Sequence, residues 1–204
     1  MYEIESTTGY VLSYYNVGEA DRRYKILTPN RGVVVGGATS VRKEKSKLKF
    51  FLQRYNYIEL EYVHGKGGYR FTGGQLLENP TTAMSRGALS VLARVGTLIE
   101  RLTQDQDEET DLFAIMQDMI RELSQTQQDN ATDREFVQHV TAIETWATAR
   151  VLIAFGYFDT AVIPEISPEI YASSILSPED VALFIKSEKP LERYTRQCVI
   201  ETML

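Results

Sequence analysis

The chain has 204 residues, of which 43% are hydrophobic and 25% are charged, and its formal net charge is −6. This length accommodates one domain with a substantial core or two small ones, and the composition is that of a globular protein rather than a disordered or membrane-embedded one. The single cysteine, Cys198, excludes an internal disulfide and any metal site built from several cysteines.

Residues 1–78 show the two-residue alternation of β-strands, with no helical period between the segments. A proline-to-glycine turn at 29–32 and a glycine-rich hairpin at 64–68 separate neighbouring strands. We expect the basic segment after the third strand to be a loop, either irregular or with one helical turn, and the fourth strand to begin near Phe51. The expected strands cover residues 8–15, 22–28, 33–37, 51–63 and 69–78.

Five short strands in an open sheet would expose two edges to other chains, and closure into a barrel removes those edges. The sequence therefore predicts a small closed or nearly closed β-barrel. Barrels of this kind recurrently bind oligonucleotides.

From residue 80 the apolar period lengthens to that of helices, about 3.6 residues. An acidic linker at 105–111 separates the first two helices, and Gly156 is expected to end the long third one. The three apolar stripes lie in segments 81–104, 112–123 and 133–155, and two Ser-Pro-Glu caps follow at 167–169 and 177–179. The fold class predicted is α+β, with an oligonucleotide-binding (OB) barrel at 1–79 and a helical domain at 80–204.

The charge is divided unequally between these halves. Residues 1–80 carry 12 Lys or Arg and 8 Asp or Glu, whereas residues 81–204 carry 10 and 20. Segment 41–55 alone has six Lys or Arg and one Glu, beside several aromatic residues. Basic groups gain affinity for nucleic acid by releasing counterions from phosphates, and aromatic rings stack on bases.

We therefore expect a nucleic-acid surface on the barrel. Its expected cations are Arg42, Lys43, Lys45, Lys47, Lys49, Arg54, Lys66 and Arg70, and its expected stacking rings include Tyr55 and Tyr69, with Tyr57 and Phe71 as further candidates. The alternative is that the rings are core or cross-strand residues and that the basic loop is merely solvated.

The helical half offers fewer functional candidates. An acidic partner would find positive charge at Arg150, Lys186, Lys189, Arg193 and Arg196, and a solvated face is an equal alternative for each. The sole tryptophan, Trp146, lies on an apolar stripe and is expected to pack in the core.

Nothing in the sequence predicts catalysis. The two histidines, His64 and His139, do not have metal-ligand spacing, and the glycines and lysine at 64–68 lack the pattern of a phosphate-binding P-loop. Neither a cofactor nor a metal is expected, and Cys198 is expected to fill the core.

The first ten residues do not resemble a secretory signal, so we expect a cytoplasmic, nucleoid-associated protein.

The first 80 residues resemble the RecO recombination-mediator proteins of bacteria. The resemblance runs through "GEAD" at 18–21, "LTPNRG" at 27–32, the basic loop "VRKEKSKL" at 41–48 and the hairpin "GKGGYRFTGGQLLEN" at 65–79. The segment "ETWATARVLIAFGYF" at 144–158 is also similar to a helix of that family.

The resemblance implies an OB barrel followed by helices, and no enzyme activity. It implies binding to single- and double-stranded DNA, strand annealing, and loading of recombinase together with RecR on DNA coated by single-strand-binding protein (SSB), whose C-terminal tail is a further partner. Many family members carry a four-cysteine zinc site after the "GY" segment, and this chain has no cysteine there. We therefore expect a short member without zinc.

Two alternative functions remain open. One is a protein-interaction adaptor whose barrel has little DNA affinity, and the other is an RNA-binding barrel.

Overall fold

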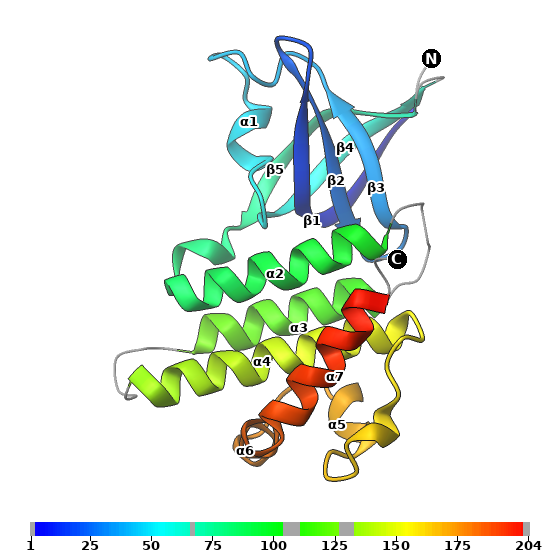
Figure 1. The fold of residues 1–204 in the computed structure, drawn as a ribbon. Helices are drawn as coiled ribbons and strands as arrows, with labels where there is room; N and C mark the ends of the chain where they lie inside the picture. The colour runs from blue at the N-terminus through cyan, green and yellow to red at the C-terminus, as the bar shows by residue number, and fades with distance from the viewer. Residues whose placement is uncertain (1–2, 66–67, 104–110, 127–132, 202–204) are drawn as a thin grey trace. The chain divides into compact units, whose positions relative to one another are not determined.

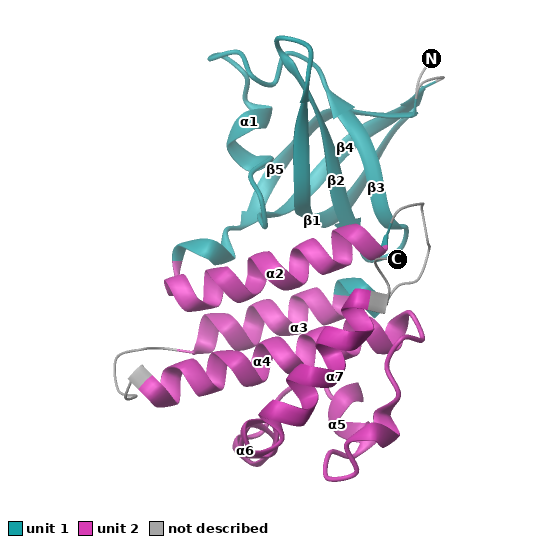
Figure 2. Ribbon diagram, in the orientation of Figure 1, with its two compact units in different colours: residues 1–82, 103–113 teal, residues 83–102, 114–204 magenta. Residues whose placement is uncertain are grey.

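The computed structural model of this chain describes residues 3–65, 68–103, 111–126 and 133–201 (Figure 1). By their internal contacts the residues form two compact units (Figure 2). The first contains residues 1–82 and 103–113, and the second contains residues 83–102 and 114–204.

The first unit is a closed five-stranded barrel with the strand order β1-β2-β3-β5-β4 (Figure 1). Neighbouring strands are antiparallel except for β3 and β5, which pair in parallel and close the barrel. The strands are β1 (Ile4–Val17), β2 (Asp21–Thr28), β3 (Gly32–Ala38), β4 (Tyr57–Gly65) and β5 (Gly68–Glu78). The predicted barrel followed by helices, and with it the α+β fold class, is confirmed.

The barrel core follows the alternation seen in the sequence. Tyr24 and Ile26 of β2 point inward with Leu60 and Tyr62 of β4, and all four are fully or almost fully buried. Burying each such side chain contributes about 1.5–3 kcal/mol, so this cluster supplies much of the stability of the unit.

The fourth strand begins at Tyr57, so its predicted start near Phe51 was wrong. Residues 48–51 instead form a single helical turn, α1 (Leu48–Phe51), whose Phe51 is buried in the barrel core. The chain returns to β1 through Tyr55, whose backbone N–H donates to the Val11 carbonyl at 2.7 Å. Consecutive apolar residues at 50–52 fit a strand or a helical turn equally well, and packing against the barrel decides between them.

The second unit is built around α4 (Asp133–Ala154), which packs against α2, α5, α6 and α7. The predicted apolar stripes are buried in it, and Trp146 is completely buried, with its indole N–H donating to the Ile170 carbonyl at 3.3 Å. The other helices are α2 (Arg86–Leu102), α3 (Asp111–Gln125), α5 (Pro168–Ala172), α6 (Pro178–Lys186) and α7 (Glu188–Glu201), with 3₁₀ turns η1 (Pro80–Thr82) and η2 (Thr160–Val162).

The helix ends follow their sequence signals. Ser177 forms a capping box with Asp180 at the start of α6. Gly156 adopts a φ of 72° just after α4, where the backbone N–H groups of Gly156 and Tyr157 satisfy carbonyls of the last turn. Among the described residues, no helix is long and apolar enough to cross a bilayer.

Closure of the barrel depends on Gly36, which lies opposite Tyr69 in the β3–β5 pair. A Cβ atom at Gly36 would lie 2.3 Å from the ring of Phe71, which is itself buried in the core. The neighbouring Gly37 faces away from this contact, and a Cβ there would meet nothing closer than the Arg22 carbonyl oxygen at 4.0 Å.

We therefore expect Gly36→Ala to lower the free energy of unfolding by about 1–3 kcal/mol, the usual cost of overpacking a core. Gly37→Ala is the matched control and is expected to change it by less than about 0.5 kcal/mol. Urea unfolding followed by circular dichroism measures both. Equal stability of the two variants would show that the close approach to Phe71 does not limit closure.

Candidate nucleic-acid interface

The basic segment between β3 and α1 is held at its start by the β1–β2 turn. The backbone N–H of Ser40 donates to Asp21 Oδ1 at 2.7 Å. The backbone N–H of Arg42 donates to the Ala20 carbonyl at 3.0 Å, and its guanidinium donates to the Gly18 carbonyl at 3.1 Å. We call residues 42–49 the lysine loop. Arg42, the first residue of this loop, thus fixes where the loop leaves the barrel.

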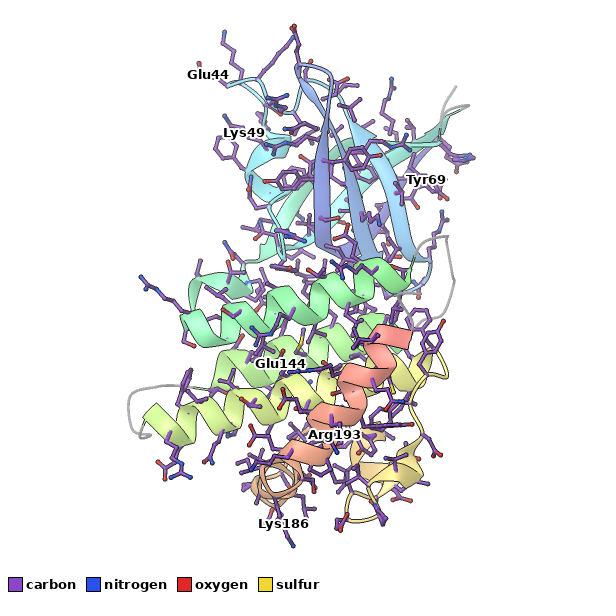
Figure 3. All side chains as sticks on the ribbon, in the orientation of Figure 1. Glu44, Lys49, Tyr69, Glu144, Lys186 and Arg193 are labelled. Atoms are coloured by element: carbon purple, nitrogen blue, oxygen red, sulfur yellow. The ribbon has the colours of Figure 1, made fainter. Side chains whose placement is uncertain are left out.

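The four lysines of this loop are not used in holding the barrel together. Lys43, Lys45 and Lys47 are exposed and Lys49 is half-buried. Within the described part of the chain, their ammonium groups make no hydrogen bond or ion pair. Lys49 Nζ lies 5.1 Å from the ring centre of Phe50, which is 69% exposed. Figure 3 shows Lys49 at the outside of the barrel. The loop therefore presents free positive charge beside one exposed ring.

Arg54 and Tyr55 contact other parts of the barrel. Arg54 Nε donates to the Leu12 carbonyl at 2.8 Å, which ties the segment after α1 to β1. Tyr55 is only 7% exposed and adopts a φ of 67°. The predicted stacking role of Tyr55 is therefore corrected, because a buried ring offers no face to a base. Phe71 is corrected for the same reason, since it belongs to the core.

The remaining predicted residues of the barrel do not join the lysine loop. Arg70 is exposed on β5, and the half-buried Tyr69 packs edge-on against Tyr62 at 5.2 Å between ring centres. Figure 3 shows Tyr69 on the opposite side of the barrel from Glu44 and Lys49. Lys66 lies outside the described residues. The expected interface is thus divided into two surfaces.

The second surface includes residues that the sequence analysis missed. A cavity of about 200 Å³ lies between β2, β3 and the start of β5, and Arg22, Arg23 and Arg70 line it. Arg22 also lies 4.2 Å from the ring centre of Tyr14 and donates from Nε to Asn16 Oδ1 at 3.1 Å. The adjacent arginines of β2 and the tyrosine pair of β1 are visible in the sequence, but only the strand register shows that Arg22 shares a face with Tyr14 and that Arg23 shares the other face with Tyr15.

In the helical unit, Arg150 is committed to an internal ion pair. Its Nη1 donates to Asp118 Oδ2 at 2.9 Å, and Arg121 donates to the other oxygen of the same carboxylate at 2.9 Å. The Arg150 guanidinium also lies 4.7 Å from the ring centre of Trp146. The prediction that Arg150 meets an acidic partner is corrected, because its charge is buried and already paired.

Glu122 lies one helical turn after Asp118 on α3, and burial raises the pKa of its carboxyl group. The neighbouring Arg121 and a backbone hydrogen bond from Leu176 act in the opposite direction.

The other predicted basic residues of this unit are on its surface. Lys189, Arg193 and Arg196 line a groove of about 600 Å³ along α7, with Ile200 as its exposed apolar member. Lys186 ends α6 and is exposed. Figure 3 shows Arg193 on α7 and Lys186 at the end of α6. A separate cavity of about 680 Å³ lies between α2, α4 and α7 and shares Glu192 and Arg196 with the groove.

Candidates for catalysis gain no support from the described residues. Among them, no group of three or more His, Cys, Asp or Glu side chains is placed to hold a metal ion. Burial lowers the pKa of His139, and Cys198 is buried.

Comparison with known proteins identifies relatives. Residues 1–80 match the family model described as "Recombination protein O N terminal". A DNA repair protein RecO of Dehalococcoides mccartyi (strain 195) is 32% identical over 124 residues, which cover 60% of this chain and 49% of that protein. A DNA repair protein RecO of Trichodesmium erythraeum is 25% identical over 173 residues, or 84% of this chain and 56% of that protein. The chain thus spans about half the length of these curated relatives.

We expect Arg150→Ala to lower the free energy of unfolding by about 3 kcal/mol or more, because it leaves the buried Asp118 carboxylate with only Arg121. The matched control is Arg196→Ala, which removes an exposed pair with Glu192 at 2.7 Å and is expected to cost less than about 1 kcal/mol. The fluorescence of Trp146, the sole tryptophan, follows unfolding in urea. Equal losses in the two variants would contradict the structural role of Arg150.

Proposed function

We propose that this chain, whose residues 1–80 match the N-terminal model of the RecO family, is a non-catalytic DNA-binding mediator of recombinational repair. In this proposal the barrel binds single- and double-stranded DNA, promotes strand annealing, and helps RecR to load recombinase on SSB-coated strands. The observation that carries the DNA-binding part is the lysine loop, whose ammonium groups make no hydrogen bond or ion pair among the described residues.

Free ammonium groups make an efficient phosphate-binding surface. Binding of a phosphate by Lys43, Lys45 or Lys47 would break no internal ion pair, so the gain from releasing counterions is not offset by a lost contact. The exposed ring of Phe50 adds a face on which an unpaired base can stack. The neighbouring Glu44 is the loop's single acid and does not reverse its sign.

The same charges account for annealing without catalysis. Two complementary strands repel each other through their phosphates, and this repulsion acts over roughly 10 Å at 0.1 M salt. Lysines bound to one strand reduce the repulsion and allow bases to meet. Reading of a specific sequence is not part of the proposal, because α1, the helix that follows the basic segment, has only four residues.

We further propose that the groove along α7 binds the acidic C-terminal tail of SSB. Lys189 and Arg193 supply positive charge along one helix, and Ile200 gives an adjoining apolar contact. Arg196 lies beside them and pairs with Glu192 at 2.7 Å, a pair that an acidic tail would have to share or replace. Lys186 lies near the end of the preceding helix. The participation of RecR is supported by the family alone.

The DNA-binding proposal is tested by changing Lys43, Lys45, Lys47 and Lys49 to Gln. With four to five phosphates neutralised, log affinity of the wild type for a fluorescent single strand should fall with log salt at a slope of about −3. The variant should bind roughly tenfold or more weakly at low salt and show a clearly smaller slope than the wild type. Fluorescence anisotropy at several salt concentrations measures both quantities.

A matched control carries the same change of net charge in the helical unit, at Lys186, Lys189, Arg193 and Arg196. This control is expected to keep the wild-type slope. Equal loss of DNA binding in both variants would mean that only net charge matters. Absence of binding by the wild type at low salt would instead favour the protein-interaction adaptor.

The same two variants test the tail-binding proposal, with the helical-unit variant now as the test and the lysine-loop variant as its control. A labelled acidic peptide with an apolar C-terminal residue should bind the wild type and the lysine-loop variant equally, because the loop belongs to the other unit. The helical-unit variant should lose about 1–3 kcal/mol of binding free energy for each charged contact removed. Isothermal titration calorimetry measures this loss, and unchanged binding would reject the groove as the tail site.

A further inference from the structure

A row of paired residues on the barrel places two arginines on either side of a glycine. In the strand register, Arg23 of β2 pairs with Gly37 of β3, and Gly37 pairs with Arg70 of β5. Tyr15 of β1 pairs with Arg23 on the other side. Directly paired residues share a face of the sheet, so all four lie on one outer face. We call Tyr15, Arg23, Gly37 and Arg70 the arginine row.

The glycine leaves a hollow between the two arginines. Neighbouring strands are about 5 Å apart, so the backbones of Arg23 and Arg70 are separated by about 10 Å across β3. A Cβ atom on Gly37 would meet nothing nearer than the Arg22 carbonyl oxygen at 4.0 Å. The hollow coincides with the cavity of about 200 Å³ lined by both arginines and Gly37.

The side chain of Arg23 lines this hollow. A Cβ atom built on Gly68 of β5 would lie 3.9 Å from Arg23 Nη2, so the side chain extends across β3 towards β5. Its Nε is buried and has no hydrogen-bond partner among the described residues. A buried donor without a partner costs free energy, and an anion in the cavity would recover it. Asp21 also lines the cavity, and its Oδ1 already accepts the Ser40 N–H at 2.7 Å.

Two guanidinium groups on either side of a small hollow can together donate hydrogen bonds to one phosphate. The planar fork of arginine matches phosphate oxygens, and such charge-assisted hydrogen bonds are stronger than neutral ones. The cavity is smaller than the 300 Å³ or more that drug-sized ligands usually occupy. Beside it, Tyr15 is 54% exposed and offers a ring to a base next to the bound phosphate.

We propose that the arginine row is a second phosphate site, distinct from the lysine loop, that holds one backbone phosphate of single-stranded DNA with an adjoining base stacked on Tyr15. The inference rests on the proposed function in that its ligand is DNA. Paired bases in a duplex are already stacked and cannot reach Tyr15 without flipping. The arginine row therefore favours single strands, whereas the lysine loop meets phosphates of either form.

The test compares three single substitutions, which remove a positive charge, fill the hollow at Gly37 and remove the ring of Tyr15, respectively. Arg70→Gln removes one guanidinium from an exposed position, Gly37→Val fills the hollow while keeping both arginines, and Tyr15→Ala removes the ring. Lys25→Gln is the matched control, because it removes one positive charge from β2 opposite Val35, outside the cavity. Circular dichroism verifies that each variant is folded.

Each variant is titrated with a fluorescent strand of roughly 15 thymidines, within the site size of an OB barrel, and with a hairpin duplex. Arg70→Gln should lower single-strand affinity roughly tenfold, the effect of one charged hydrogen bond, and reduce the salt slope by about 0.7. Gly37→Val should lower the affinity and the slope similarly. Tyr15→Ala should weaken the single strand alone, with unchanged duplex affinity and salt slope.

The outcomes separate this inference from the proposed function. If the wild type binds DNA and the lysine-loop variant loses that binding, but Arg70→Gln and Gly37→Val behave like Lys25→Gln, the arginine row is rejected and the proposed function stands. Equal effects of Gly37→Val on strand and duplex would also reject a single-strand site. If the wild type binds no DNA at low salt, both fail.

Discussion

The parallel pairing of β3 with β5 is the constraint on which the rest of the barrel depends. Among the described residues, these strands pair directly at two positions, Gly36 with Tyr69 and Gly37 with Arg70. A parallel pair cannot be joined by a tight turn, so the chain must cross from β3 to β4 before β5 returns. That crossover is the lysine loop with α1. The same pairing therefore creates both the basic loop and the row that brings Arg70 close to Arg23.

The two glycines at this closure have different consequences. Gly36 faces inward, where its missing side chain lets the Phe71 ring approach β3 and fill the core. Gly37 faces outward, where its missing side chain leaves a hollow between arginines. Successive residues of a strand point to opposite faces, so Gly36 can contribute to the core while Gly37 contributes to the outer surface. A dipeptide of identical residues thus serves packing on one face and leaves the proposed phosphate site open on the other.

Much of the fold could be predicted because it is governed by local signals. The alternation of Ile58 and Leu60 with glutamates, and the Ser-Pro-Glu cap of α6, act within a few residues of the chain. The buried stripe around Trp146 is equally local. The helical turn at 48–51 could not be distinguished from a strand, because burial of Phe51 depends on a barrel assembled from distant segments.

The candidate sites were predictable only in part for the same reason. A run of lysines in a loop is exposed wherever the loop goes, so composition identified it. Whether a ring or a cation is free depends on contacts made far along the chain, as the burial of Tyr55 and the pairing of Arg150 with Asp118 show. The arginine row is wholly a product of register between three strands, and no single stretch of sequence contains it.

The β1–β2 turn contacts both basic surfaces, although they lie on different sides of the barrel. Val17, Asp21 and Thr39 line the arginine-row cavity, and the same turn accepts hydrogen bonds from Ser40 and Arg42 at the start of the lysine loop. A single strand leaving the arginine row along this rim would therefore reach the lysines without crossing the barrel wall. Phosphates fixed at the row and loosely held at the loop would leave the intervening bases free to pair. Such an arrangement would suit the proposed annealing, because a strand that is stacked at every base cannot accept its complement.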